Sequence, residues 1–250
     1  MFAILLFFVL HWYSSLFMQT FLHHRYASHS AFTMSRFWER VSYLTAFITQ
    51  GSSYVSPRVY AIMHRMHHAY ADTPEDPHSP KYDSNFFTMM WRARQVSRGI
   101  YFGKTAVDPR FLKNLPDWRA LDLTGHATVT RLAWIAAYVA FYLVFAPSYW
   151  WFLLLPLHIL MVPMHGAIIN WFAHKYGSVN FEVKNTSTNL LHIDLLMMGE
   201  AYHNNHHKHP SASNFGYRWY EFDPTYFVMR GLNRLGVIRL PQRNKRIRQE

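Results

Sequence analysis

Two long stretches of this chain carry no charged residue, and they constrain the fold more than any other feature. No Lys, Arg, Asp or Glu occurs in residues 1–24 or in residues 132–174. At about 1.5 Å per helical residue, residues 1–22 reach about 33 Å, which is enough to cross a hydrocarbon core about 30 Å thick. The second stretch is interrupted by Ala146-Pro147-Ser148 and predicts a hairpin of two spans. We therefore expect three transmembrane helices, at residues 1–22, 128–146 and 149–171.

The charged residues are confined to the rest of the chain, where they give a formal net charge of +11. Ten Lys and Arg lie in residues 57–127, and five more lie among the last twelve residues. By the positive-inside rule the flanking regions, 23–127 and 172–250, are cytoplasmic and the tip of the hairpin faces outward. A basic chain can also bind nucleic acid, but no nucleic-acid-binding motif accompanies these charges, so no such partner is expected.

The segment 37–56 is apolar in the middle but carries charged or polar residues at both ends. Such a short segment is interfacial or buried rather than spanning. The remaining cytoplasmic sequence is helical in pattern. We expect one domain over residues 1–250, an all-α integral membrane protein in which one helix and a hairpin cross the bilayer beneath a helical cytoplasmic cap.

Cysteine is missing from the chain, whereas histidine occurs 17 times. Without Cys there can be no disulfide, no iron–sulfur cluster, no thiolate zinc site and no Cys nucleophile. Two sets of histidines have the spacing HxxHH, at residues 64–68 and 203–207. A random chain with this much histidine would show about 0.08 such motifs, so the two together indicate a selected arrangement.

The spacing of the histidines predicts a metal site. In a helix, positions i, i+3 and i+4 share one face, so two facing HxxHH motifs make a ring of imidazoles suited to two metal ions. His24 and His29 are about 140° apart on an ideal α-helix and converge only where the helix ends or is distorted. Asn170 and His174, at the end of the last predicted span, are i and i+4 and point the same way.

Four segments resemble the histidine boxes of the stearoyl-CoA desaturase family of membrane fatty acid desaturases. They are His24–His29 (HRYASH), His64–His68 (HRMHH), Asn170–His174 (NWFAH) and His203–His207 (HNNHH). Their order, spacing and membrane context agree with that family over nearly the whole chain. The resemblance implies an O2-dependent enzyme with two iron ions in a dinuclear histidine site under the cytoplasmic cap.

In that family nine histidines bind the irons, and an asparagine holds a metal-bound water. Carried over, this implies one iron bound by His24, His29, His64, His68 and His207. It implies a second iron bound by His67, His174, His203 and His206, with Asn170 reaching it through water. Imidazole suits iron, zinc and copper alike, so the expected redox chemistry selects iron.

Topology supports this arrangement, because the four boxes can meet only if an even number of spans separates consecutive boxes. The hairpin supplies two spans between the second and fourth boxes, and none should lie between the first and second. Such desaturases usually carry a further span before the one that enters the first box. Only 23 residues precede His24 here, so three spans and an external N-terminus are expected.

Metal-bound histidines usually need an acceptor for the second ring nitrogen. The nearest acidic residues in the sequence are Asp72, Asp76, Asp194 and Glu200. Each of them could instead be a helix cap or a surface acid.

The substrate is expected to lie in an apolar tunnel between the spans. Trp12, Tyr13 or Leu16 would limit the length of the acyl chain, because Tyr13 lies about three turns before His24 on nearly the same helix face. Arg92, Arg94 and Arg98 follow the second box and would hold phosphates of coenzyme A. Core packing for the first set and a solvated basic face for the second remain open.

Removing hydrogen from an unactivated methylene needs an oxidant made from O2 and two electrons. By resemblance, the product is a cis double bond near carbon 9 of a long acyl chain on coenzyme A or another carrier. The chain has no room for a fused redox domain, so a separate ferredoxin, rubredoxin or cytochrome b5 type protein would donate the electrons. The membrane would be the inner membrane in a bacterium or the endoplasmic reticulum in a eukaryote.

Two other functions compete with this interpretation. A diiron hydroxylase of lipids or alkanes shares the first step, although the HxxxxH spacing of the first box favours desaturation. The other is a non-enzymatic membrane protein that binds metal or haem, and a haem would need paired histidines within the spans. His11, His158 and His165 are placed for that role, but it would leave the nine clustered histidines unexplained.

Overall fold

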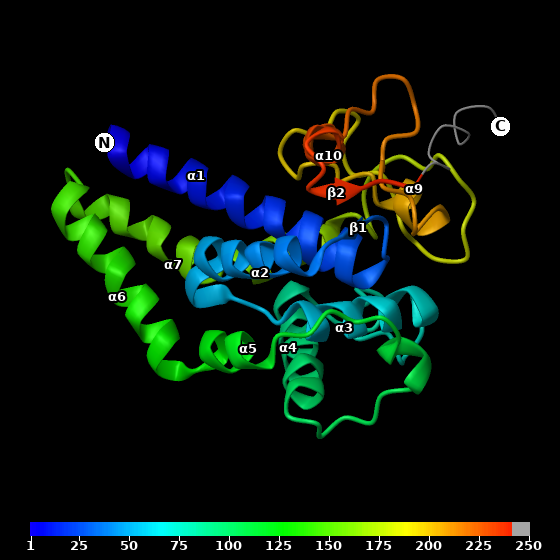
Figure 1. The fold of residues 1–250 in the computed structure, drawn as a ribbon, viewed down its shortest axis with the longest axis horizontal. Coiled ribbons are helices and arrows are strands. Elements are labelled where there is room, and N and C mark those ends of the chain that lie inside the picture. The colour runs from blue at the N-terminus through cyan, green and yellow to red at the C-terminus, as the bar shows by residue number, and fades with distance from the viewer. Residues whose placement is uncertain (242–250) are drawn as a thin grey trace.

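The structure is a computed structural model and describes residues 1–241. It is mostly helical, as predicted. Helices α1, α6 and α7 extend toward the left of Figure 1, whereas α3, α4, α9 and α10 lie toward the centre and right. The basic residues 243–248, which we assigned to a cytoplasmic end, lie outside the described residues.

The first helix, α1 (Phe2–Met18), continues without a break into a π-helical segment, η1 (Gln19–Ser28). Together they form one helix of 27 residues that is apolar and long enough to cross a membrane. The helix therefore reaches beyond the predicted span, and its last turns carry the first histidine box.

A second candidate span is α6 (Thr128–Phe145). We predicted a third span over 149–171, and the structure has two helical pieces there that meet at an angle of 70°. They comprise η4 (Tyr149–Leu154), α7 (Leu155–Ile159), α8 (Met161–Ala167) and η5 (Ile168–Phe172). Because Pro163 has no amide hydrogen to donate to the oxygen of Ile159, the helix breaks between α7 and α8.

The break is supported by a short 3-10 turn, η2 (Gly51–Ser53). The Ser52 hydroxyl donates to the oxygen of Ile159 at 3.2 Å, and the amide of Val162 donates to the Ser53 hydroxyl at 3.2 Å. Non-helical backbone at membrane depth needs such internal partners. Sequence analysis therefore missed a bend that aims the end of the hairpin at the histidine sites.

Helix α2 (Arg36–Gln50) packs along α1 and is not among the described helices that could span a membrane. Its buried Glu39 accepts a hydrogen bond from the hydroxyl of Tyr26 at 2.6 Å. The carboxylate is therefore held by the neighbouring helical segment. This arrangement agrees with the expectation that residues 37–56 do not cross the bilayer.

The other described elements surround the histidine boxes. They are α3 (Pro57–Tyr70), α4 (Phe86–Tyr101), η3 (Pro109–Leu112), α5 (Arg119–His126), α9 (His203–Lys208), α10 (Pro224–Arg234), β1 (Thr33–Met34) and β2 (Ile238–Arg239). The two strands pair antiparallel, a small addition to the predicted all-α fold.

A buried ion pair holds the C-terminal part of the chain against η1. Arg25 donates to the carboxylate of Asp223 at 2.8 Å, and its guanidinium lies 4.0 Å from the centre of the Phe215 ring. Asp223 also caps α10 by accepting from the amide of Tyr226. Segments nearly 200 positions apart in the sequence (|i−j| of 198) are thereby fixed beside the first box.

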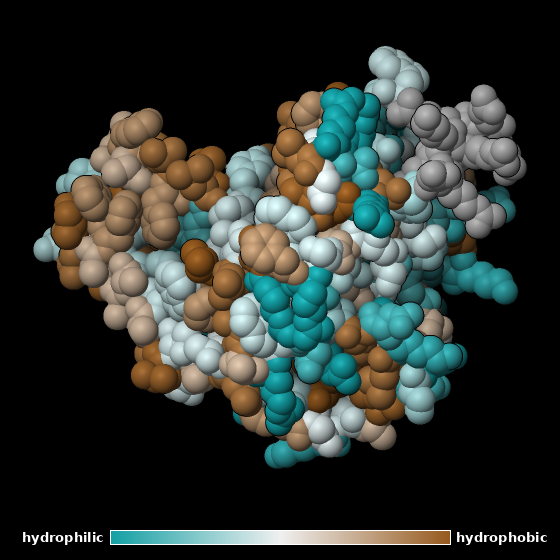
Figure 2. Space-filling view, viewed as in Figure 1, coloured by the Kyte–Doolittle hydropathy of each residue, from teal (hydrophilic) through white to brown (hydrophobic). Residues whose placement is uncertain are grey.

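Hydrophobic side chains cover the end of the molecule that carries α6, α7 and the start of α1 (Figure 2). On α6, Leu143 is 67% and Val144 73% exposed, and Phe2 of α1 is 77% exposed. A continuous apolar surface of this kind is suited to lipid rather than to water. The chain is a membrane protein.

Candidate metal centre

The first box lies on the π-helical turns of η1. The amide of His29 donates to the oxygen of His24 at 3.3 Å, which is the i to i+5 bond of a π-helix. This wider turn brings residues five apart onto one face, and the two ring centres are 5.1 Å apart. The prediction that the helix must be distorted between His24 and His29 is confirmed.

The second box lies on α3, a helix with a well-formed start. The hydroxyl of Ser56 accepts from the amide of Val59, and Pro57 occupies the first turn. Ser56 also donates to the buried carboxylate of Asp122 at 2.7 Å. The start of α3 is thereby fixed to α5, which in turn sets the position of its three histidines.

The last box lies on α9, which has only six residues. So short a helix is not stable alone, and side-chain amides hold it in place. The side-chain oxygen of Asn189 accepts from the amides of Asn204 and Asn205, at 3.0 and 3.2 Å. Asn204 in turn accepts from the amides of Asn180 and Phe181. The two asparagines of HNNHH therefore bind the surrounding loops, and its histidines face the site.

The structure brings the nine predicted histidines together in two groups. Within each group, one ring nitrogen per residue lies within 4.8 Å of the others. The first group is His24, His29, His64, His68 and His206, and the second is His67, His174, His203 and His207.

The allocation of two residues was wrong: His206 belongs to the five-histidine group and His207 to the four-histidine group. Helix geometry explains the exchange. Positions i and i+4 are about 40° apart around an α-helix, whereas i+3 lies about 60° away on the other side. Thus His203 stays with His207, their Nε2 atoms 3.0 Å apart, and His206 turns toward the other group.

The arrangement of the ring nitrogens fits a bound metal. Neighbouring Nε2 atoms within the groups are 2.8 to 3.3 Å apart. Two nitrogens at right angles on one ion, each about 2.1 Å from it, would be about 3.0 Å apart. An all-imidazole set suits iron and equally zinc or copper. The residues present therefore fit two ions without identifying the metal.

Most of these imidazoles are held in the neutral form that binds metals. Burial, followed by the charge of neighbouring histidines, lowers the pKa of six of them well below the ordinary value: His29, His64, His68, His203, His206 and His207. For His174 the pKa falls to about 4, again mainly through burial.

Two of the four acidic candidates accept directly from a histidine of the groups. Glu200 lies 2.5 Å from Nδ1 of His24, and both carboxylate oxygens of Asp76 lie 3.0 Å from Nδ1 of His67. Although burial raises the pKa of Asp76, the contact with His67 outweighs it and lowers that pKa. Each carboxylate fixes one ring, so that its Nε2 faces the other histidines.

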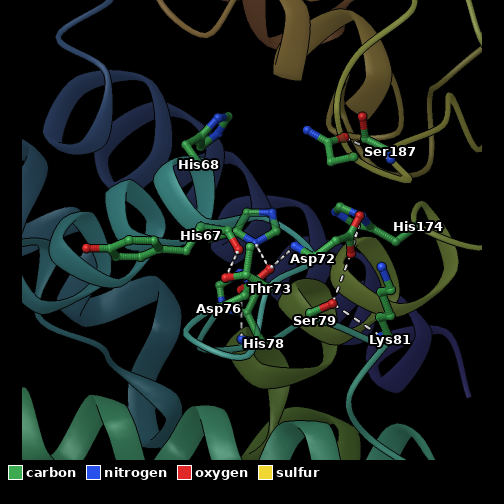
Figure 3. A network of polar contacts seen from close by, with 12 residues as sticks. His67, His68, Asp72, Thr73, Asp76, His78, Ser79, Lys81, His174 and Ser187 are labelled. Carbon is green, nitrogen blue, oxygen red and sulfur yellow. Dashed lines mark hydrogen bonds and ion pairs between the residues drawn. The ribbon is translucent and has the colours of Figure 1, made fainter.

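The remaining two acids differ. Asp72 lies 4.0 Å from Nδ1 of His174, too far for a hydrogen bond (Figure 3). It accepts from the amide of Thr186 at 2.6 Å and so holds the loop beside His174. Asp194 contacts no histidine among the described residues. It accepts from the amides of Met197, Gly199 and Ala201 at 2.7 to 2.9 Å and closes a loop.

Sequence analysis missed several supporting side chains. Thr20 donates to the second oxygen of Glu200, Thr186 contacts Nδ1 of His174 at 3.2 Å, and Asn185 contacts Nδ1 of His207 at 3.1 Å. Thr20 lies one helical turn before His24, which is a signal that could have found it. Asn185 and Thr186 lie in a loop without a motif, and no spacing rule points to them.

A cavity of about 1170 Å³ reaches the histidine groups. His24, His64, His203 and Asn170 line it, as do Leu16, Arg92, Arg94 and Arg98. Arg92 is already engaged by the carboxylate of Asp83 at 2.5 Å and by backbone oxygens. Trp12 and Tyr13 do not line this cavity. They line a second hollow of about 490 Å³ beside α1.

The chain is similar to known fatty acid desaturases. A family model described as fatty acid desaturase matches residues 1–237. The Delta-9 desaturase-like 5 protein of Arabidopsis thaliana is 28% identical over 240 residues, which cover 89% of this chain and 72% of the relative. The sn-1 stearoyl-lipid 9-desaturase of a Synechocystis strain is 27% identical, over 87% of this chain and 66% of the relative. The icosanoyl-CoA 5-desaturase of Limnanthes douglasii is 27% identical, over 89% of this chain and 61% of the relative.

Proposed function

Because this chain belongs to the fatty acid desaturase family, and is therefore an oxidoreductase that desaturates fatty acyl substrates in membranes, we propose that its two histidine groups bind two irons. The observation that carries the proposal is the convergence of nine buried or half-buried imidazoles in two groups. We propose a cis double bond near carbon 9 of a long acyl chain as the product. The reaction would take two hydrogens from the chain and, with two electrons and two protons, reduce O2 to two waters.

The bound irons would supply the oxidising chemistry with O2, and the protein would hold and orient the reactants. Glu200 and Asp76 would hold the rings of His24 and His67 in fixed directions. Asn170, which lines the cavity, would reach the four-histidine group through a water. Apolar side chains such as Leu16 and Ile169 would exclude bulk water and hold the acyl chain beside the histidines.

The acyl carrier in this proposal is coenzyme A. Arg94 and Arg98 line the cavity and are exposed, and Glu200, at the histidine end, is the only acid among the described lining residues. An anionic carrier is therefore favoured at the end near α4. Arg92 contributes less, because Asp83 neutralises it. Of the residues proposed to limit chain length, Leu16 lines the cavity directly, whereas Trp12 and Tyr13 would act from the neighbouring hollow.

The electrons would come from a separate ferredoxin, rubredoxin or cytochrome b5 type protein. By the positive-inside rule the histidine groups face the cytoplasm, with the chain crossing an inner membrane or endoplasmic reticulum. Residues 23–127 and 172–250 would form the cytoplasmic cap of one domain.

The experiment is to express the chain in cells and to analyse the fatty acids of every lipid pool by mass spectrometry. We expect a new monounsaturated acid with the wild type and none with His67→Ala. The matched control is His192→Ala, because His192 is exposed and belongs to neither group. Absence of any new double bond with the wild type would contradict the proposal, and a hydroxylated product would favour the hydroxylase alternative.

A further inference from the structure

The smaller hollow lies beside α1, next to the reaction cavity. Its walls come from α1, from η5 and from the loop that precedes the last box. Every lining residue is apolar or aromatic: Phe8, Val9, Trp12, Tyr13, Ile168, Leu190, Leu191, Leu196 and Met197. Because α1 is a candidate span and Val9 is 48% exposed, the mouth of this hollow opens toward the hydrocarbon of the bilayer.

Only a thin partition separates the hollow from the reaction cavity. Met197 lines both spaces. On α1, Trp12 lines the hollow and Leu16, one turn later, lines the cavity. The Trp12 ring also lies edge-on against His165, with centres 4.4 Å apart, and His165 lines the cavity. Methionine is unbranched and flexible, so a side chain of this type can move aside without moving the backbone.

The loop from Leu190 to Met198 exposes large apolar side chains that are suited to contact lipid. Ile193, Leu195 and Leu196 are 56 to 62% exposed, although they lie outside any helix or strand. The Trp12 indole donates to the oxygen of Leu196 at 3.5 Å, which ties the loop to α1. Asp194 fastens its other side through three backbone amides. The loop therefore holds its apolar side chains out from a rigid base rather than collapsing onto the protein.

We propose that the hollow is a binding site for the hydrocarbon chain of a membrane lipid and that Met197 is the movable partition between it and the reaction cavity. An acyl chain passes sideways between bilayer and cavity at this point. The occupant is lipid hydrocarbon because the site is apolar throughout and continuous with the lipid-facing surface of α1. The lipid site stands without the proposed function, but passage of a reacting chain rests on it.

The first test asks whether the hollow faces lipid. The chain has no cysteine, so a fluorophore can be attached at Leu196→Cys alone, with the protein in vesicles of phosphatidylcholine brominated on its acyl chains. We expect quenching comparable to that of Val9→Cys on α1 and well above that of Glu182→Cys, an exposed charged position. Quenching at Leu196→Cys as weak as at Glu182→Cys would overturn the lipid site, whether or not the protein desaturates anything.

The second test asks whether the partition matters. Met197→Trp fills the passage, and we expect turnover of a vesicle-embedded acyl substrate to fall by about tenfold with metal content unchanged. The control is Val144→Trp, which adds the same ring on the lipid-exposed face of α6. If Met197→Trp loses its metal, Ile168→Trp narrows the hollow from η5 instead. Wild-type turnover in a metal-replete variant would overturn the passage, whereas a wild type without turnover would contradict the proposed function instead.

Discussion

Histidines occupy two buried regions of this protein, and the two regions differ in what surrounds the rings. At the boxes, nine imidazoles converge, and carboxylates fix two of them. In the spans, His11 and His158 bond to each other at 2.7 Å, and His158 bonds to the hydroxyl of Tyr142 at 2.9 Å. Within residues 1–241, neither ring nitrogen of His165 has a hydrogen-bond partner. The difference shows that convergence, and not burial alone, distinguishes the histidines proposed to bind metal.

Removal of a histidine from a box should have the largest effect. His206→Ala removes one ligand from the five-histidine group, and we expect activity to fall by at least about a hundredfold. Metal analysis should show loss from one site with the second retained. Equal loss from both sites would contradict the division into two groups.

Removal of a carboxylate should come next. Asp76→Asn keeps the shape but not the charge, so His67 loses its strongest acceptor, and metal affinity should fall by about 10- to 100-fold. Competition with a chelator measures this change. Asp83→Asn is a suitable control because Asp83 pairs with Arg92 rather than with a histidine. An unchanged metal affinity in Asp76→Asn would contradict the role of Asp76 in holding His67 for metal binding.

Acid should destabilise the metal-free protein through the boxes. Burial depresses the pKa of His174 to about 4, so between pH 6.5 and 4 the unfolded chain binds a proton that the folded chain does not. The contribution of His174 to the free energy of unfolding is fully present above pH 6.5. As the pH falls toward 4, up to about 3 kcal/mol of it is lost. Thermal unfolding at several pH values measures this loss, and stability independent of pH over that range would contradict it.

The histidine pair in the spans should matter for stability alone. His158→Phe leaves His11 and Tyr142 without a partner, which should cost about 1 to 3 kcal/mol of unfolding free energy. Metal content should not change. A loss of metal in His158→Phe would mean that the two regions are coupled and would weaken the comparison.

The smallest effect is expected at His165. Its two ring nitrogens are buried and have no hydrogen-bond partner in the part of the chain that the structure describes. His165→Leu should therefore leave the free energy of unfolding unchanged or raise it by about 1 kcal/mol. A large decrease in melting temperature would show that His165 has a polar partner in the membrane.

Much of the metal centre follows from local spacing. HxxHH places three rings on one side of a helix wherever that helix lies, so α3 and α9 could be predicted from residues 64–68 and 203–207. The division of His206 and His207 follows from the same geometry, and the prediction failed because it relied on resemblance instead.

The parts that failed depend on distant segments. The 70° bend needs Pro163 and also the serines of η2, which bind Ile159 and Val162 across separations of 107 and 109 positions in the sequence. Asn185 and Thr186 reach the rings from a loop whose course is set by its neighbours. Asp194 was expected near a histidine because it is close in sequence to the last box. Its carboxylate instead accepts hydrogen bonds from backbone amides of its own loop.

The π-helical segment η1 connects the candidate span α1 directly to the first histidine box. Because α1 and η1 form one unbroken helix, the number of residues in Gln19–Ser28 fixes how α1 is rotated relative to the first box. Deleting one residue would turn the preceding helix by about 100° relative to the boxes. The face of α1 that now meets lipid would then turn toward the protein. Insertions and deletions in this segment should therefore abolish the site even where they leave every histidine in place.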